Sequence, residues 1–497
     1  MDTIQNWTDA LRYQTYNQWR PDYIQALKAQ ISQSHWRFSY HIQPETGLLN
    51  DPNGFSYFNG QWHVFYQAFP FGPVHGLKSW YHLYSDNLVD WQRDQLRVLP
   101  DTPLDSHGVY SGSALPVDDQ LFLAFTGNVR DENWDRHAYQ LGAWMQPDFT
   151  VEKMTTPLIP APPTGYTHHF RDPQIFTYNE LFYMIIGAQN EQEEGKILLY
   201  RGTSVTNWTL VGELDFTTEQ MGYMIECPNL VFVDNQPVLL FCPQGMPQTV
   251  CAYQNIYPNM YVTAEAFDEK TATLLQPSSL ANLDEGFDVY ATQAFQAPDG
   301  RTLSIGWVGL PDVSYPSDRE NWAHCLTLVR ELTMKNGQLR QTPVAEMTTL
   351  REEAMPITEQ LATEVTLLAQ PARNCYEMEL IIPANTQSQF TLFADSANSR
   401  GFVITCDTKN GMIVVDRGQM TELVNPTYGT TRTTTLTPNT ATTLRIFVDY
   451  SICEVFVNEG EKVLTSRVFS AESETSIFFK GSLTQATIWP LRPMKTN

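Results

Sequence analysis

Five segments of the chain share one pattern, in which a short strand, a tight polar turn and an aromatic or aliphatic strand follow one another. They read FSYFNGQWHVFYQ, ALPVDDQLFLAFTG, QIFTYNELFYMIIGA, NLVFVDNQPVLLFCP and AFQAPDGRTLSIGWVG. Their turns fall at Asn59, Asp118, Asn179, Asp234 and Asp299, so successive repeats are 59, 61, 55 and 65 residues apart. A unit of this length accommodates four short strands, and five such units in a ring make a five-bladed β-propeller.

Shorter hairpin-like pieces lie between most of these repeats and would supply the third and fourth strands of each blade. They read YSDNLVDW, MQPDFTVEKM and SVTNWTLV. The alternative is a large sandwich of unrelated hairpins whose period is a coincidence. The regular spacing favours the propeller.

The sequence predicts an all-β chain with a short helical start. Residues 1–35 carry aromatic and aliphatic side chains at helical spacing, interrupted by Pro21, which predicts two short helices. We expect the propeller over residues 36–350 and a polar connector over residues 351–365. Residues 366–497 contain short alternating strands at regular spacing, which is typical of a β-sandwich.

Charge and cysteine content narrow the possible partners and the compartment. The 55 acidic and 31 basic side chains give a net charge of -24, which would repel a nucleic acid, so none is expected. No secretion signal follows Met1 and no apolar stretch is long enough for a membrane span, so we expect a cytoplasmic protein without a membrane partner. Seven cysteines without paired spacing fit reduced thiols. We expect no metal and no cofactor.

A polar residue of catalytic type lies seven to nine positions before each of the five turns. These residues are Asp51, Ser111, Asp172, Glu226 and Tyr290. Equivalent positions on the innermost strands of a propeller meet around its central channel, so three carboxyl groups would converge. A glycosidase needs such a set, because one carboxyl group protonates the leaving oxygen and another attacks the sugar.

Taken singly, each of these motifs has a simpler interpretation. The run Asn50 to Gly54 is dense in turn-forming residues, and Arg171-Asp172-Pro173 could be a surface ion pair before a strand. Glu226 lies within MIECPNLVF, where apolar neighbours would favour the protonated form that a general acid needs. The convergence of three blades is what favours catalysis.

The combination of several motifs resembles glycoside hydrolase family 32. They are HIQPETGLLNDPNGFSYFNGQWHVFYQ, the SGS at residues 111–113, FRDPQIF, MIECPNLVF and FVDYSICEVFVNEGEKVLTSRVF. The segments HGLKSW and FDVYATQAF are similar to those of bacterial members that act on sucrose 6-phosphate. The resemblance implies a propeller joined to a sandwich and retaining hydrolysis of the β-fructofuranosyl bond of sucrose 6-phosphate, sucrose or both, with release of fructose.

The resemblance also implies roles for individual residues. Asp51 would attack the anomeric carbon C2, Glu226 would act as acid/base, and Asp172 would stabilise the transition state. Cys227 is expected to tune Glu226. The candidate substrate-binding residues are Leu49, Asn50, Gln67, Tyr110, Ser111, Arg171, Tyr290 and Trp307, the last of which could equally be a core tryptophan.

A phosphorylated substrate would require a local cationic patch in so acidic a protein. His75 and Lys78 are the first candidates, although Lys78 could be a solvated surface residue. Arg130, Arg136 and His137 are the second choice. Hydrolysis of longer fructans, fructosyl transfer and non-catalytic carbohydrate binding are the alternative functions.

Overall fold

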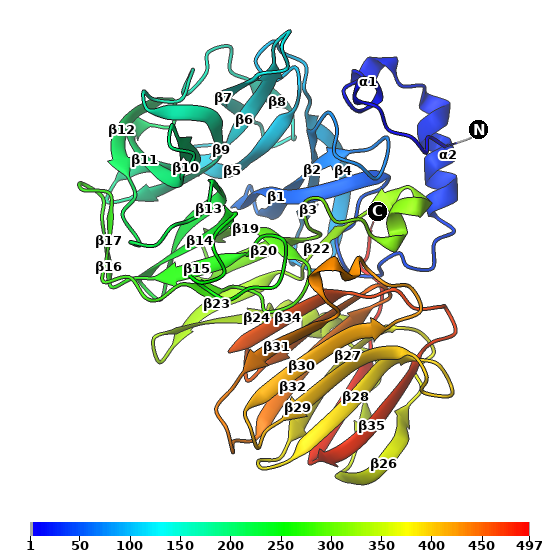
Figure 1. The fold of residues 1–497 in the computed structure, drawn as a ribbon. Coiled ribbons are helices and arrows are strands. Elements are labelled where there is room, and N and C mark those ends of the chain that lie inside the picture. The colour runs from blue at the N-terminus through cyan, green and yellow to red at the C-terminus, as the bar shows by residue number, and fades with distance from the viewer. Residues whose placement is uncertain (1–2, 497) are drawn as a thin grey trace.

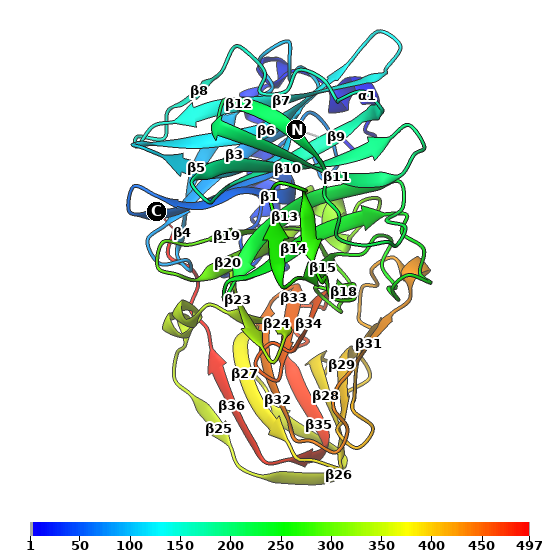
Figure 2. The ribbon, with the colours of Figure 1, turned by 90° about the vertical axis from the view of Figure 1, so that its left-hand side faces the viewer.

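The computed structural model describes residues 3–496 and consists mainly of β-strands (Figure 1). The strands from β1 to β24 form one body and those from β25 to β36 a second body beside it, which Figure 2 shows from a second direction. The first body is a ring of five sheets and the second is a two-layer sandwich. The structure therefore confirms the predicted all-β architecture.

Five sheets form the blades of the propeller, as the five repeats predicted. Blade I contains β1 (Gly47–Phe58), β2 (Gln61–Phe69), β3 (Ser79–Ser85), β4 (Trp91–Val98) and β21 (Trp322–Ala323). Blade II contains β5 (Val109–Val117), β6 (Gln120–Arg130), β7 (Arg136–Met145) and β8 (Val151–Lys153). Blade III contains β9 (Tyr166–Tyr178), β10 (Leu181–Asn190), β11 (Gly195–Ser204) and β12 (Asn207–Glu213).

The remaining two blades complete the ring. Blade IV contains β13 (Met224–Val233), β14 (Gln236–Gln244), β15 (Met260–Thr263) and β18 (Ala281–Asn282). A small separate hairpin is made of β16 (Ala266–Asp268) and β17 (Thr273–Leu275). Blade V contains β19 (Val289–Gln296), β20 (Thr302–Val308), β22 (Cys325–Leu326), β23 (Arg330–Lys335) and β24 (Gln338–Pro343).

The innermost strands β1, β5, β9, β13 and β19 contact one another in that order, and β19 contacts β1, so the ring is closed. β21, which follows β20 in the chain, pairs in parallel with β1 and ties the end of the propeller to its beginning. Asn59, Asp118, Asn179 and Asp234 have φ between 47° and 52° in the tight turns of the first four hairpins. Asn and Asp tolerate this left-handed conformation, which explains their recurrence in the repeat.

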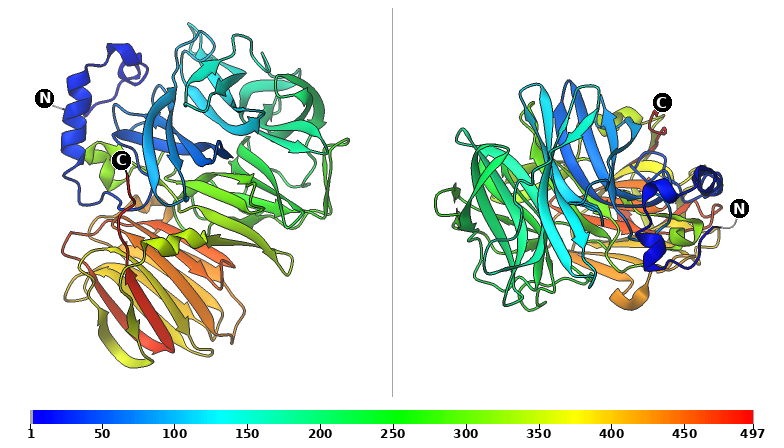
Figure 3. Two further views of the ribbon diagram at one scale, coloured as in Figure 1. Left: turned by 180° about the vertical axis from the view of Figure 1, so that it is seen from behind. Right: turned by 90° about the horizontal axis from the view of Figure 1, so that it is seen from above.

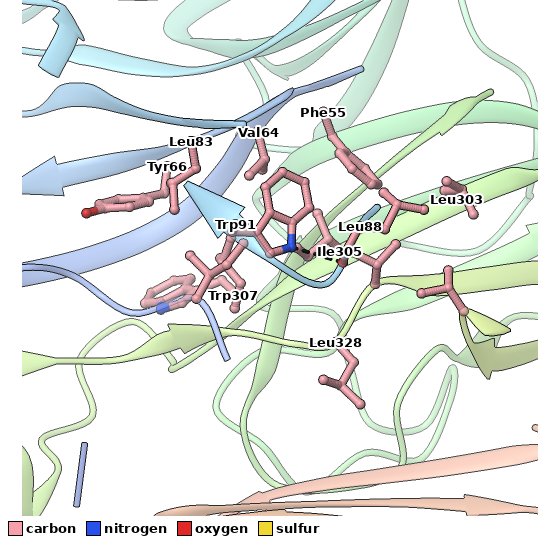
Figure 4. Packing of buried hydrophobic residues seen from close by; sticks show 14 of the residues in the cluster. Phe55, Val64, Tyr66, Leu83, Leu88, Trp91, Leu303, Ile305, Trp307 and Leu328 are labelled. Atoms are coloured by element: carbon pink, nitrogen blue, oxygen red, sulfur yellow. Dashed lines mark hydrogen bonds between the residues drawn. The ribbon is translucent and has the colours of Figure 1, made fainter. Parts of the chain in front are cut away.

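The core between blades I and V is aromatic and aliphatic (Figure 4). Phe55 and Val64 of blade I and Ile305 and Trp307 of blade V are at most 2 % exposed. Burial of each such side chain stabilises the fold by roughly 1.5–3 kcal/mol. This packing joins the last blade of the ring to the first.

The C-terminal body is a sandwich of two six-stranded antiparallel sheets. One sheet contains β25 (Met355–Ile357), β36 (Gln485–Pro490), β27 (Cys375–Ile382), β32 (Thr442–Asp449), β33 (Ile452–Val457) and β34 (Lys462–Arg467). The other contains β26 (Gln360–Ala369), β35 (Ser476–Leu483), β28 (Gln387–Ala394), β29 (Gly401–Asp407), β30 (Met412–Gln419) and β31 (Thr431–Thr435). Buried side chains from both sheets form one core between them.

Residues 351–365, expected to be a polar connector, contain β25 and the first part of β26. These strands pair with β36 and β35 at the edges of the two sheets. Edge strands expose one side to solvent, which explains why a polar sequence there looked like a connector. The segment is therefore part of the sandwich.

The N-terminal segment forms the two expected helices, α1 (Asp9–Arg12) and α2 (Pro21–Ile31), with a 3-10 turn at Tyr16–Gln18 between them. Pro21 begins α2, where its missing N–H group costs no hydrogen bond. α2 buries Tyr23, Leu27 and Ile31 in a cluster with residues of blade I. Figure 3 shows the segment against the propeller from two further directions.

Three more 3-10 helices lie in connections, at Pro316–Glu320, Ala345–Leu350 and Pro426–Tyr428. Within residues 3–496, no helix combines the length and the apolar character needed to cross a membrane.

Candidate active site

Each innermost strand of the propeller has an irregularity at the position where a catalytic residue was predicted. The pairing with the second strand of the blade is interrupted between residues 49 and 52, 109 and 112, 171 and 174, 226 and 229, and 290 and 293. Such a β-bulge leaves residues unpaired and turns their side chains away from the regular alternation. Five bulges at one level of the ring therefore direct five sets of side chains into the central funnel.

A cavity of about 300 Å³ lies at this level. It is lined by these residues of the predicted site: Asn50, Asp51, Gln67, His75, Lys78, Tyr110, Arg136, Arg171, Asp172, Glu226, Tyr290 and Trp307. Arg12, Tyr13, Gly76, Pro311 and Asp312 complete the lining. The structure thus brings the three candidate carboxyl groups, from β1, β9 and β13, into one cavity.

Asp51 is the end of a chain of hydrogen bonds that starts at Lys78. Lys78 Nζ donates to Asn50 Oδ1 at 2.5 Å, and Asn50 Nδ2 donates to Gln67 Oε1 at 2.7 Å and to Asp51 Oδ1 at 3.1 Å. Gln67 Nε2 donates to Ser111 Oγ at 2.6 Å, and the Ser111 hydroxyl donates a short hydrogen bond to Asp51 Oδ2. Burial raises the pKa of Asp51, while the Ser111 hydrogen bond opposes that rise. The network fixes the carboxylate in one orientation.

Asp172 lies next to Asp51 on the other side of a cysteine thiol. Cys227 Sγ is 3.6 Å from Oδ2 of both carboxyl groups, and the backbone N–H of Cys227 donates to Asp172 Oδ2 at 3.0 Å. Asp172 and Cys227 both have positive φ, at 67° and 49°, which costs backbone energy outside glycine. Burial is the main cause that raises the pKa of Asp172, and Glu226 and Asp51 add to the rise against the opposing effect of Arg171. The expected partner of Cys227 was Glu226, but its thiol contacts the two aspartates.

Glu226 occupies polar surroundings. Its Oε1 accepts hydrogen bonds from Arg171 Nε at 3.0 Å and Nη2 at 2.8 Å, and its Oε2 accepts one from the Tyr290 hydroxyl at 2.8 Å. The expectation of apolar surroundings for Glu226, drawn from the segment MIECPNLVF, is therefore wrong. The bulge turns Glu226 into the funnel while its neighbours Met224 and Ile225 are buried elsewhere in the core.

Trp307 fits both interpretations of its role. It belongs to the core between blades I and V, and its ring also lines the cavity, 6.0 Å from His75 and 6.1 Å from Tyr290. Leu49 does not line the cavity. Its side chain is fully buried, and its carbonyl group contacts His324 Nδ1 at 3.1 Å.

Lys78 is 3 % exposed, so it is not a solvated surface residue. Burial lowers the pKa of Lys78 to about 7, and its ammonium group donates a hydrogen bond to Asn50. Lys78 therefore acts on Asp51 through Asn50, and it is not placed to bind a distant part of a substrate. Arg136 lines the cavity, whereas Arg130 and His137 do not.

A second ring of polar residues was missed by the sequence analysis. Its members lie two or three positions after the five predicted site residues in the sequence. Each member accepts a hydrogen bond of 2.7–3.2 Å from a backbone N–H of the next blade: Asn53, Ser113, Gln174, Asn229 and Gln293. They link all five inner strands directly below the site. Their repetition two or three positions after the five predicted site residues was the signal that could have found them.

Three carboxyl groups and a cationic partner in the funnel of a five-bladed propeller define a glycoside hydrolase. Residues 41–343 match the family model for the N-terminal domain of glycosyl hydrolases family 32, and residues 346–490 match the model for its C-terminal domain. The chain belongs to glycosyl hydrolase family 32.

Known proteins resemble the chain over almost its whole length. Sucrose-6-phosphate hydrolase of Pediococcus pentosaceus is 48% identical over 98% of this chain and 97% of its own. The structure of sucrose-6-phosphate hydrolase from Lactobacillus gasseri has a TM-score of 0.95 and 42% identity, covering 99% of this chain and 100% of its own. A variant of the Bombyx mori GH32 β-fructofuranosidase BmSUC1 in complex with sucrose has a TM-score of 0.82 and 29% identity, covering 96% and 98%.

Proposed function

We propose that this protein hydrolyses the β-fructofuranosyl bond of sucrose 6-phosphate and of sucrose, with retention at the anomeric carbon and release of fructose. The observation that carries the proposal is the convergence of Asp51, Asp172 and Glu226 in one cavity, with Asp51 and Asp172 in contact with the same thiol. The relatives named sucrose-6-phosphate hydrolase and the sucrose complex of the silkworm relative support the choice of substrates.

The first half of the reaction breaks the glycosidic bond. A carboxylate oxygen of Asp51 attacks C2 of the fructosyl unit while Glu226 transfers its proton to the departing glucosyl oxygen. The product is a covalent fructosyl ester on Asp51 and free glucose 6-phosphate or glucose. Arg171 and Tyr290 hold the Glu226 carboxyl group at the leaving oxygen through their hydrogen bonds.

The second half releases fructose. Glu226, now deprotonated, removes a proton from water, the water oxygen attacks C2, and Asp51 leaves as a carboxylate. Asp172 makes no covalent bond in either half. It accepts hydrogen bonds from ring hydroxyl groups and stabilises the positive charge that develops on the sugar.

The polar side chains around Asp51 bind the fructosyl unit. Asn50 and Gln67 have remaining hydrogen-bonding capacity beside the nucleophile, and Trp307 gives the sugar an apolar face. Ser111 acts on the nucleophile itself through its hydroxyl group.

We place the reaction in the cytoplasm. All seven cysteines are free thiols, and Cys227 sits between two catalytic carboxyl groups, where oxidation would add bulk and charge. A reducing compartment protects this site.

The test is to incubate the purified protein with sucrose 6-phosphate, sucrose and a short fructan, and to quantify fructose and the glucosyl product separately. Equal amounts of fructose and glucose 6-phosphate support hydrolysis of the phosphorylated sugar. A deficit of fructose at high substrate concentration would indicate transfer of the fructosyl group to sugar. Binding without turnover of any substrate would leave only a carbohydrate-binding role.

A further inference from the structure

The N-terminal segment, residues 3–35, contributes to the wall of the cavity although it precedes the part of the chain that matches the family models, which begins at residue 41. Arg12, the last residue of α1, and Tyr13, which follows it, both line the cavity. No residue of this segment was a candidate in the sequence analysis, because nothing in its helical pattern points toward the propeller funnel.

Hydrogen bonds fix the segment to the loop after β2. The backbone N–H of Leu77 donates to the carbonyl oxygen of Arg12 at 2.8 Å, and Arg12 Nη1 donates to the carbonyl oxygen of His75 at 3.3 Å. The Tyr16 hydroxyl donates to the carbonyl oxygen of Leu77 at 2.9 Å and lies 2.8 Å from Ser79 Oγ. The position of Tyr13 is therefore built into the fold.

The ring of Tyr13 reaches across to blade II. It packs edge-on against Trp134 at 5.1 Å and lies 5.8 Å from the ring of His107. Arg130 Nη1 donates to the carbonyl oxygen of Trp134 at 3.1 Å, which holds the loop between β6 and β7 in place. β7 begins at Arg136, whose side chain lines the same cavity as Tyr13.

Four cationic side chains line the cavity, and they differ in the partners that they already bind within the protein. Arg171 is paired with Glu226, Lys78 is buried against Asn50, and Arg12 bonds to backbone carbonyl groups. Among residues 3–496, the side chain of Arg136 has neither an ion pair nor a hydrogen bond, and its guanidinium lies 5.8 Å from the ring centre of Tyr110. An uncompensated arginine in a cavity of a protein with a charge of -24 is available to an anion.

The surroundings of Arg136 are positive as well. His169 Nδ1 lies 3.2 Å from Arg171 Nη1. Burial lowers the pKa of His169 to about 4, and the charges of Arg171, Arg136 and Arg130 contribute to that fall. This end of the cavity lies beside Glu226, the residue proposed to protonate the leaving glucosyl oxygen.

We infer that Tyr13 and Arg136 bind the phosphate group of the sugar phosphate, on the leaving-group side of Glu226, and that Arg12 is a positioning residue that holds Tyr13 there. The inference rests on the proposed function. Arg136 supplies a planar, permanently charged donor that suits a phosphate dianion, and Tyr13 supplies a neutral hydroxyl donor. The N-terminal segment thereby becomes part of substrate selection.

The test compares kcat/KM for sucrose 6-phosphate and sucrose in single variants. Arg136→Gln should lower kcat/KM for the phosphorylated sugar by about 10- to 100-fold, the usual effect of a lost charge-assisted hydrogen bond, and lower that for sucrose by less than about 3-fold. Tyr13→Phe should reduce the ratio of the two values by about 5-fold, since a neutral hydrogen bond is lost. Arg136→Lys should restore part of the ratio, because a charge remains.

Arg201→Gln is the matched control, since it removes one positive charge from an exposed position on β11 and should leave the ratio unchanged. Arg12→Gln should lower the ratio through displacement of Tyr13, and the double variant with Tyr13→Phe should lower it no further. Equal losses on both sugars in Arg136→Gln and Tyr13→Phe would overturn the inference while the proposed function stands. A wild-type protein that hydrolyses neither sugar would instead refute the proposed function.

Discussion

Arg171 binds Glu226 through two nitrogen atoms that share one carboxylate oxygen, at 3.0 Å and 2.8 Å. The guanidinium thus fixes the direction in which Glu226 presents its other oxygen. Arg171→Gln should lower kcat on sucrose by at least about 100-fold, because a misplaced acid loses most of the general-acid contribution.

A fructosyl fluoride, whose leaving group needs no protonation, separates this role from a structural one. Its hydrolysis by Arg171→Gln should fall by less than about 10-fold, since the variant still has its nucleophile. Equal losses on sucrose and on the fluoride would show that Arg171 does more than orient the acid.

The three carboxyl groups should each be essential for turnover and dispensable for folding. Asp51→Asn, Glu226→Gln and Asp172→Asn should each lower kcat by about 1,000-fold or more, as expected for groups that act in the transition state. Because burial raises the pKa of Asp51 and Asp172, the folded state disfavours their charged forms at neutral pH. The two aspartate variants should therefore keep or exceed the wild-type Tm in a thermal melt followed by circular dichroism. Wild-type kcat in any natively folded variant would refute the role of that residue.

Ser111 should control the acid limb of the pH profile. Asp51 must be ionised to attack, so activity is lost as the pH falls through its pKa, which burial raises and the Ser111 hydrogen bond lowers. Ser111→Ala removes the lowering effect. The acid limb of kcat/KM should then move to higher pH, because the hydrogen bond that lowers the pKa of Asp51 is lost. A shift to lower pH would contradict this arrangement.

Lys78→Met should damage both substrates alike. The lysine is buried, its ammonium group is bonded to Asn50, and its charge lowers the pKa of Asp51. We expect kcat/KM for sucrose and for sucrose 6-phosphate to fall by a similar factor of about 10, the cost of one buried charge-assisted bond. A loss of kcat/KM for sucrose 6-phosphate alone would contradict this role and would show that Lys78 binds the phosphate group.

The repeat predicted the five blades because each hairpin is a local unit, whose alternation and turn residues are readable in sequence. The spacing of Asp51, Asp172 and Glu226 from their turns also predicted their convergence, since equivalent positions meet in a ring. These predictions needed only the periodicity of the chain.

The finer arrangement depends on contacts that sequence spacing does not encode. The bulges turn Glu226 toward Arg171 and Tyr290, which reverses the expectation drawn from its apolar neighbours. Pro52, Pro173 and Pro228 stand inside these strands and were the available signal, since proline within a central strand is typical of a bulge. Arg12 and Tyr13 line the cavity because the N-terminal segment packs against the propeller. They precede its first strand by more than 30 residues, so no local sequence pattern predicts their place in the site.

The anomeric form of the first fructose released tests the central claim most directly, because a covalent ester on Asp51 requires two inversions and hence net retention. Nuclear magnetic resonance should be recorded within seconds of mixing the enzyme with sucrose, before mutarotation. The account predicts β-fructofuranose as the first product. Initial α-fructofuranose would mean that water attacks C2 directly, and it would rule out Asp51 as the nucleophile.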